Sequence, residues 1–137
     1  MRAFIDTSSL FKKYVEERGS TELESLLQEV SEIAVSPVTW IEMNAVVAKR
    51  VRERLLTLQQ ATWLKTEIRK DFQSFHCVIW NEALEQRATD LLSRHSLSTL
   101  DAIQLASGIL SKGDVFVTSD RRLFEQARKE IRRALCI

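Results

Sequence analysis

Five short apolar runs, separated by longer amphipathic segments, restrict the fold of this chain more than any other feature. The runs cover residues 2–6, 33–35, 77–80, 115–118 and 134–137. Each run has the length of a buried strand, and the segments between them are helical in pattern. Strands that alternate with helices predict an α/β domain with a mostly parallel sheet, because right-handed crossovers then place helices on both faces.

Helix start and stop signals support the same alternation. Helices are expected over about residues 10–17, 20–31, 37–54, 60–75, 82–94, 98–112 and 120–130. Ser36 and Pro37 form a good helix start, with Ser as the cap and Pro at the first helical position. Asn81 and Ser98 can cap the helices that follow them, and Gly113 can end the helix that begins near Ser98.

The length and charge of the chain limit its organisation and its partners. With 137 residues it has the size of one domain, and we expect residues 1–137 to fold as a single unit. The formal net charge of +1 gives no overall attraction to a polyanion. An anionic partner would therefore be held by local basic patches and a metal ion.

Cysteine usage and the lack of targeting signals favour a cytoplasmic protein. No apolar run is long enough to span a membrane, and the first residues reach a charge too early for a signal peptide. Cys77 and Cys136 lie in apolar runs and show no metal-ligand spacing. We therefore expect reduced cysteines in the core of a cytoplasmic protein.

Four acidic side chains stand where an α/β sheet would place a functional site. Asp6 and Asp120 follow apolar runs, at the carboxyl ends of expected strands, where the functional crevice of such sheets lies. Asp101 lies in the first turn of a strongly apolar helix, and Glu42 lies among the apolar neighbours of another. We expect three or four of these carboxylates to meet at one edge of the sheet.

Each acid has an ordinary structural explanation when it is taken alone. Asp6 can cap the first helix and Asp120 the last one. Asp101 occupies the capping-box position after Ser98. Glu42 can reach solvent from its helix, although its apolar neighbours leave little polar surface around it. The case for a site is joint, because gathered carboxylates raise one another's pKa unless a divalent cation supplies positive charge.

A group of carboxylates at one sheet edge suits a hard divalent cation. Mg²⁺ binds one or two protein carboxylates, keeps several waters and takes further ligands from a substrate phosphate. It then polarises the phosphate and lowers the pKa of a bound water, and a second metal can stabilise the leaving oxygen. The four acids therefore point to hydrolysis of a phosphodiester bond.

Four segments of the chain resemble the acidic motifs of PIN domains. They read FIDTSSL at residues 4–10, PVTWIE at 37–42, LSTLDAIQLA at 97–106 and FVTSD at 116–120. Their order and spacing, with the total length, most resemble the VapC-type ribonuclease toxins of prokaryotic toxin–antitoxin pairs. The resemblance covers essentially the whole chain, and it implies a parallel sheet of about five strands sandwiched by helices.

The resemblance also implies endonucleolytic cleavage of RNA that depends on Mg²⁺ or Mn²⁺. By position, Asp6 and Asp101 match the principal metal-binding acids of the family. Glu42 and Asp120 match the acids that complete the catalytic site, through water or a second metal. All four acidic positions are filled, so nothing in the sequence suggests a degenerate, inactive copy.

Residues beside these acids add further expectations. Thr7 and Ser119 match the small hydroxyl residues next to the first and fourth acids, with strand-end capping as an equal alternative for both. Arg121 and Arg122 directly follow Asp120, so they are the best candidates for steering RNA phosphates.

The usual partner of the VapC-type toxins is a small VapB-like antitoxin. Its C-terminal segment lies across the early helices and blocks the acidic crevice. The family thus implies an RNA substrate, an antitoxin partner, and a homodimer or a toxin–antitoxin hetero-oligomer, with no membrane association. The early helices offer apolar side chains for the antitoxin, with core packing as the alternative for each: Leu10, Phe11, Tyr14, Val15, Leu23, Leu26 and Leu27.

Two other functions stay open on the sequence alone. A phosphatase or phosphotransfer domain would use Asp6 as a nucleophile. Such enzymes usually need a second acid shortly after the first, and the residues that follow Asp6 are Thr, Ser and Ser. A non-catalytic or regulatory PIN-like binding module would use the same crevice without hydrolysis.

Overall fold

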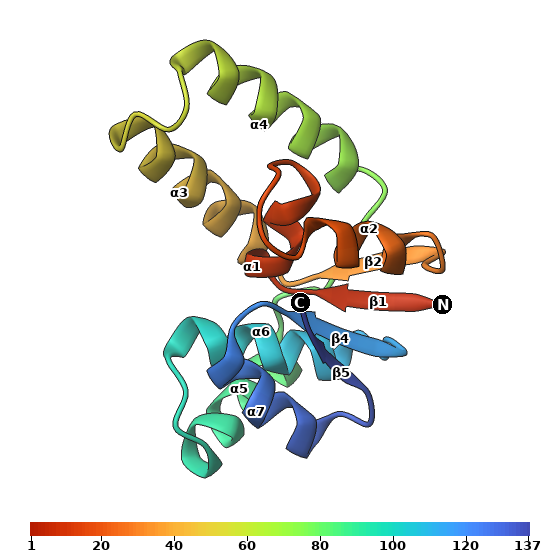
Figure 1. Cartoon of the computed structure of the whole chain (residues 1–137). Helices are drawn as coiled ribbons and strands as arrows, with labels where there is room; N and C mark the ends of the chain where they lie inside the picture. The colour runs from red at the N-terminus through yellow and green to blue at the C-terminus, as the bar shows by residue number, and fades with distance from the viewer.

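A single sheet of five parallel strands runs through the molecule (Figure 1). The strands are β1 (Arg2–Ile5), β2 (Glu32–Val35), β3 (His76–Cys77), β4 (Val115–Thr118) and β5 (Ala134–Cys136). The computed structural model describes residues 1–137 and orders the strands β3–β2–β1–β4–β5. This sheet confirms the predicted α/β fold.

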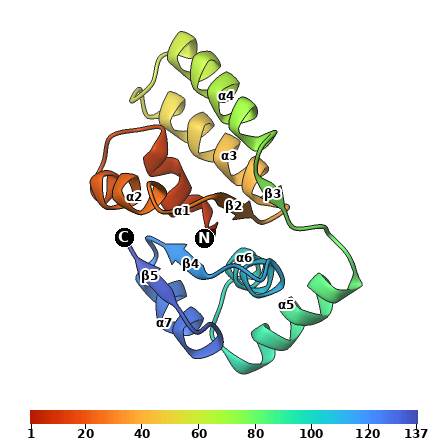
Figure 2. The same ribbon diagram turned by 90° about the vertical axis from the view of Figure 1, so that its right-hand side faces the viewer.

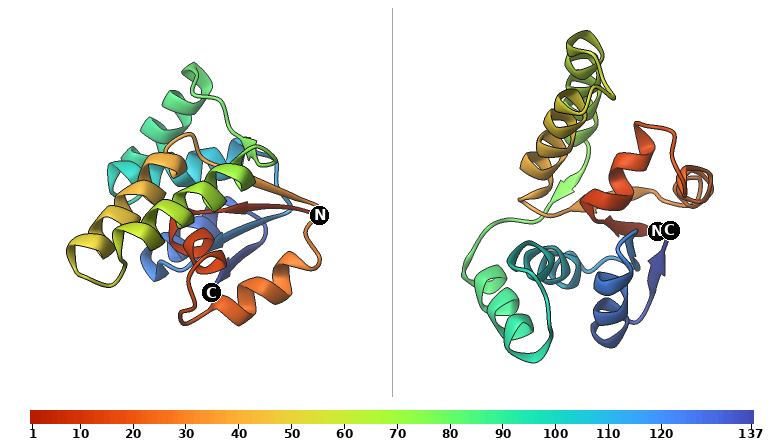
Figure 3. Two further views of the ribbon diagram at one scale, coloured as in Figure 1. Left: turned by 90° about the horizontal axis from the view of Figure 1, so that it is seen from above. Right: turned by 60° about the vertical axis from the view of Figure 1, so that its left-hand side comes forward.

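Helices cover both faces of the sheet, as expected for a sandwich. The earlier part of the chain supplies α1 (Thr7–Leu10), the 3₁₀ turn η1 (Phe11–Lys13), α2 (Ser20–Leu27), α3 (Thr39–Arg52) and α4 (Leu58–Phe72). The later part supplies α5 (Glu82–Arg94), α6 (Thr99–Leu110) and α7 (Arg121–Glu130). Figures 1 and 2 show α1–α4 on one side of the sheet and α5–α7 on the other. The pair formed by α3 and α4 extends beyond the sheet (Figure 3).

The apolar core has two parts, one on each face of the sheet, because alternate residues of a strand point to opposite faces. In β1, Ala3 and Ile5 pack on the face covered by α1–α4, whereas Phe4 packs on the other face. Phe4 stacks there on Phe116, with ring centroids 5.3 Å apart. Gly108 of α6 lies against this pair, since a Cβ at that position would come within 2.5 Å of the Phe116 ring. The close approach of α6 to the sheet thus depends on the missing side chain.

The first helix differs from the helix expected over about residues 10–17. α1 begins at Thr7, directly after β1, because the Asp6 side chain caps it by accepting a hydrogen bond from Ser9 N. It gives way after Leu10 to the single turn η1, and residues 14–17 are not helical, so the sequence-based prediction was wrong. The tight junction between strand and helix fixes Asp6 at the end of β1.

The two cysteines lie on the outer strands of the sheet. Cys77 ends β3 and Cys136 ends β5, and both side chains are exposed. The expectation of core cysteines was therefore wrong, since a strand at a sheet edge leaves some side chains in solvent. β3 is also shorter than expected, with Ile79 and Trp80 exposed beyond its end. None of the helices combines the length and the apolar character needed to cross a lipid bilayer.

Candidate functional site

Two central strands bring their acids to the same edge of the sheet. β1 and β4 are parallel neighbours, with Ile5 opposite Val117. Asp6 follows β1 and Asp120 lies two residues beyond the end of β4. The Asp6 backbone N–H donates to Val117 O (3.0 Å), which extends the strand pairing to the acid itself. The predicted placement of both acids at the carboxyl edge is thus what the structure contains.

Asp6 is the one ionisable side chain of the protein that is buried, with 4% of its surface exposed. Its Oδ1 accepts hydrogen bonds from Ser8 Oγ (2.7 Å) and Ser9 N (3.0 Å), and its Oδ2 accepts one from Thr118 Oγ1 (2.6 Å). Burial raises the pKa of Asp6 to about 6; these hydrogen bonds lower the pKa, and the negative charge of Glu42 raises it. No cationic side chain pairs with this carboxylate.

Glu42 is held by side chains from two other helices. Thr7 Oγ1, on α1, donates to Glu42 Oε1 (2.9 Å), and Gln104 Nε2, on α6, donates to the same oxygen (2.6 Å). Gln104 Nε2 also lies 3.0 Å from Thr7 Oγ1, so the three side chains form one network. The predicted importance of Thr7 therefore has a structural basis beyond capping, because its hydroxyl orients an acid.

Asp101 and Asp120 form a second pair of neighbouring acids. Ser98 caps α6, with its Oγ accepting from Asp101 N (3.1 Å). Partial burial raises the pKa of Asp101, Ser98 lowers it and the negative charge of Asp120 raises it. Asp120 caps α7 through its Oδ1, which accepts from the N–H groups of Arg122 (2.8 Å) and Leu123 (3.1 Å). The capping explanation is thus correct for Asp120, whereas for Asp101 only the Ser98 cap is present and its own side chain completes no capping box.

Thr118 joins the two pairs of acids. Its hydroxyl donates to Asp6 Oδ2 and accepts from Asp120 N (3.0 Å). Nevertheless, no group of three or more His, Cys, Asp or Glu side chains converges closely enough to hold a metal ion. The charge of Glu42 thus acts on Asp6 and that of Asp120 acts on Asp101, while the four acids form no preformed cluster of three. Mg²⁺ uses one or two protein carboxylates and fills its other positions with water and phosphate, so a site at this edge does not need three converging acids.

Three residues of this edge were not singled out in the sequence. They are Gln104, Thr118 and Ser8, each of which binds one of the acids. Gln104 had a visible signal, because it is a polar residue in a strongly apolar helix and follows Asp101 by three positions, on the same helix face. Thr118 and Ser8 had none, since a hydroxyl at a strand end or in a first turn is common.

The comparison with protein families identifies the fold independently. A family model described as PIN domain matches residues 3–130. The comparison with curated proteins gives no match.

Solved structures share this fold at low sequence identity. A toxin–antitoxin complex from Klebsiella pneumoniae is 21% identical and covers 89% of both chains, with a TM-score of 0.66. FitAcB from Neisseria gonorrhoeae is 13% identical and covers 97% of this chain and 96% of its own, with a TM-score of 0.72. VapBC2 from Rickettsia felis, bound to a DNA fragment from their promoter, is 12% identical, covers 100% and 99%, and has a TM-score of 0.70. Together with the family match over residues 3–130, the shared fold means that the chain belongs to the PIN domain family.

Proposed function

We propose that this chain is a metal-dependent endoribonuclease and the toxin component of a type II toxin–antitoxin pair. Membership of the PIN family, whose domains are generally nucleases, supports hydrolysis of nucleic acid. The observation that carries the proposal is the environment of Asp6. It is a buried carboxylate without a positive partner, at an edge where three more acids lie.

The donor set fits Mg²⁺ or Mn²⁺. Asp6 and Asp101 would hold the ion, and Glu42 and Asp120 would complete the site through water or a second ion. Glu42 Oε2 and Asp120 Oδ2 accept no hydrogen bond from the protein, so each keeps a free oxygen for a ligand or a water. A bound divalent ion would supply positive charge to the scissile phosphate and lower the pKa of a coordinated water.

The protein's own contribution is to hold the acids in place before substrate arrives. Three hydrogen bonds fix Asp6, and the Thr7–Gln104 pair fixes Glu42. Groups held in this way need no reorganisation during the reaction, which is the main source of electrostatic catalysis. A fixed carboxylate with a free oxygen, such as that of Glu42, can also orient a water or accept its proton.

An antitoxin partner is the second part of the proposal. Solved structures of the same fold include toxin–antitoxin complexes, which supports a VapB-like partner here. Of the apolar side chains that the early helices offer, Leu10, Phe11 and Leu23 are buried and belong to the core. We propose that the antitoxin contacts the partly exposed remainder, which is Tyr14, Val15, Leu26 and Leu27.

The decisive experiment incubates purified protein with total cellular RNA, with Mg²⁺ or with a chelator, and maps the new ends. Asp6→Asn and Asp101→Asn should each reduce cleavage by at least about 100-fold while the protein stays folded. Asp114→Asn is the matched control. Asp114 lies just before β4, at the end of that strand away from the acidic edge. Its Oδ2 accepts a hydrogen bond from Arg2 N (2.7 Å).

Other outcomes would identify the alternative functions. Full cleavage by Asp6→Asn or Asp101→Asn would remove these acids from the site. A phosphoaspartate trapped in acid at Asp6 would identify a phosphotransfer enzyme instead. RNA binding without cleavage, and without any change on calorimetric titration of Mg²⁺, would identify a binding module.

A further inference from the structure

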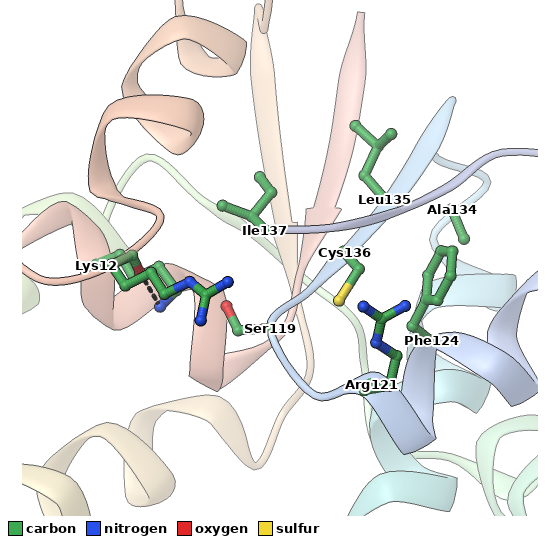
Figure 4. A pocket seen from close by; sticks show the side chains of 9 residues that line it. Lys12, Ser119, Arg121, Phe124, Ala134, Leu135, Cys136 and Ile137 are labelled. Atoms are coloured by element: carbon green, nitrogen blue, oxygen red, sulfur yellow. Dashed lines mark hydrogen bonds between the residues drawn. The ribbon is translucent and has the colours of Figure 1, made fainter.

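A pocket of about 560 Å³ opens beside the acidic edge, between η1, α7 and β5 (Figure 4). Its polar lining consists of Lys12, Arg18, Ser119 and Arg121. Its apolar lining comes from Phe124 and residues 134–137. The volume falls within the range of ~300–1,000 Å³ that is common for pockets that bind small molecules or cofactors.

The pocket carries an excess of positive charge. Three cationic side chains line it and no acidic side chain does, so the lining stays positive even when the α-carboxylate of Ile137 is counted. Arg18 and Arg121 are exposed and form no ion pair with any acid of the protein. Lys12 donates to Arg18 O (2.6 Å) and lies 3.5 Å from Glu17. Two free guanidinium groups at one pocket are suited to a phosphate, because their planar donors match its oxygens.

The pocket adjoins the candidate active site through Ser119. In Figure 4, Ser119 lies between Lys12 on one side and Arg121 and Phe124 on the other. Its Oγ lies 2.8 Å from Ser9 Oγ, and its backbone N–H donates to Ser8 Oγ (3.0 Å), which itself binds Asp6. A polyanion that reached the acidic edge would therefore have the pocket directly beside it.

We propose that this pocket binds one nucleotide of single-stranded RNA, next to the phosphodiester bond that is cut. Arg18 and Arg121 bind its phosphate, and Phe124 with the apolar end of β5 contacts its base. Proteins that bind single-stranded nucleic acids combine cationic side chains, which contact the phosphates, with aromatic side chains, which stack on the bases. The inference rests on the proposed function, because it makes the pocket a subsite for the substrate.

On the sequence alone Arg121 and Arg122 have the same expected role, but the structure distinguishes them. Arg121 lines the pocket, whereas its neighbour Arg122 does not. Both are exposed residues in the first turn of α7, and neither forms an ion pair. Arg121→Gln and Arg122→Gln are therefore a matched pair that differ only in whether the lost charge faces the pocket.

The test measures binding of a fluorescein-labelled ten-nucleotide oligouridylate by anisotropy, in the presence of a chelator and over a series of salt concentrations. Arg121→Gln should weaken binding about tenfold, as expected for loss of a hydrogen bond to a charged group. It should also reduce the slope of log K against log salt by about 0.7. Arg18→Gln should act in the same way, although it lies in a different part of the chain. Arg122→Gln should change affinity by about twofold or less at physiological salt.

Recovery of part of the affinity in Arg121→Lys would show that charge at the pocket matters, with the bidentate geometry supplying the rest. Equal losses in Arg121→Gln and Arg122→Gln would overturn the inference, because RNA would then respond only to the overall charge of this face. Unchanged RNA affinity in Arg121→Gln and Arg18→Gln would overturn it as well. Labelled hexaglutamate serves as a second probe. If Arg121→Gln and Arg18→Gln weakened binding of hexaglutamate but not of RNA, the pocket would be a site for an acidic segment of a partner protein.

The binding measurement does not depend on cleavage, so the two proposals fail separately. If wild-type protein cleaves RNA with Mg²⁺ while Arg121→Gln and Arg122→Gln bind equally well, the pocket assignment is wrong and the nuclease stands. If the variants show the expected pattern and no cleavage occurs, the pocket is an RNA site and the proposed nuclease activity is wrong. Thermal unfolding by circular dichroism checks that each variant is folded.

Discussion

The carboxylate of Asp6 links the stability of the metal-free protein to pH. For an acid whose pKa is raised on folding, the native state binds more protons than the unfolded state between the two pKa values. Burial moves the pKa of Asp6 from 3.8 to about 6. The free energy of unfolding therefore falls as the pH rises through this window, and above it the ionised carboxylate destabilises the fold.

Asp6→Asn should stabilise the metal-free protein at pH 8 by about 1–3 kcal/mol. A pKa shift of about two units corresponds to ~3 kcal/mol, and the amide loses part of the carboxylate's hydrogen bonding. At pH 4 the gain should disappear, because Asp6 is then largely protonated in the native state. Urea unfolding at both pH values with a chelator measures this, and Asp114→Asn serves as the control. If the variant were less stable than wild type at pH 8, the hydrogen bonds that the carboxylate accepts would outweigh the cost of burying its charge.

Strand ends made two of the site residues predictable. Asp6 and Asp120 follow apolar runs, and the carboxyl ends of parallel strands share an edge, so their placement followed from the pattern alone. The contact of Glu42 with Gln104 could not be predicted in this way, because it depends on how two helices on opposite sides of the sheet edge meet. The chemical roles of the four acids stay predictions, and the nuclease assays described above test them.

At the scale of whole elements, Gln104 links its own helix α6 to α1 and α3. The residue is 3% exposed, and its Nε2 reaches Thr7 on α1 and Glu42 on α3. Its Oε1 is buried and accepts no hydrogen bond. A side chain that leaves one polar atom unsatisfied while it orients an acid contributes more to the site than to stability.

Gln104→Leu should therefore reduce the rate of RNA cleavage about tenfold or more and change stability by only about 1 kcal/mol. The lost hydrogen bonds are offset by removal of the unsatisfied carbonyl, while Glu42 loses a fixed orientation. Measurements of kcat and KM should place the loss in kcat. Gln86→Leu is the control, since Gln86 Nε2 donates to Glu82 Oε1 (3.1 Å) on the exposed side of α5. Equal losses in the two variants would contradict a positioning role for Gln104.

The close packing of α6 against the sheet depends on Gly108. A Cβ there would meet two Phe116 ring atoms at 2.5 and 2.7 Å, and Phe116 is almost fully buried. The apolar periodicity predicted this helix, but the Gly108 contact involves a strand later in the chain and leaves no mark in the helix pattern itself.

Gly108→Ala should destabilise the protein by about 1–3 kcal/mol in spite of the higher helix propensity of Ala, because the Phe116 ring must shift in a packed core. Chemical denaturation measures the change. In a protein that already carries Phe116→Leu, Gly108→Ala should cost less stability than it does in wild type, because the clash is then relieved. An additive double variant would show that the ring is not the obstacle.

At the scale of the whole molecule, the alternation of apolar runs predicted a parallel sheet between two layers of helices, and the structure confirms it. The predictions were wrong where tertiary context decides a boundary. Asp6 caps α1 and so starts it before the expected residue, and the edge positions of β3 and β5 expose the cysteines. The local pattern does not reveal which strand lies at an edge, because that depends on the order of strands in the sheet.

Divalent ions should stabilise the whole fold through the acidic edge. A ligand that binds only the native state adds RT ln(1 + [L]/Kd) to the free energy of unfolding, which is about 2.7 kcal/mol at 100 times the Kd. Saturating Mg²⁺ or Mn²⁺ should therefore raise the melting temperature of wild type at pH 8, compared with KCl of equal ionic strength. Asp6→Asn and Asp101→Asn should lose most of this rise, and Asp114→Asn should keep it. A rise of equal size in all four proteins would show that the ions act elsewhere.

The hydrogen bond between Thr118 and Asp6 joins residues 112 positions apart, across the pairing of β1 with β4. A ribosome that has made two thirds of this protein carries Asp6 and Glu42, but none of the later segments that tie them into the edge. Contacts of such long range also form slowly once the chain is free. The proposed activity against RNA therefore requires that β4 has already emerged and docked beside β1.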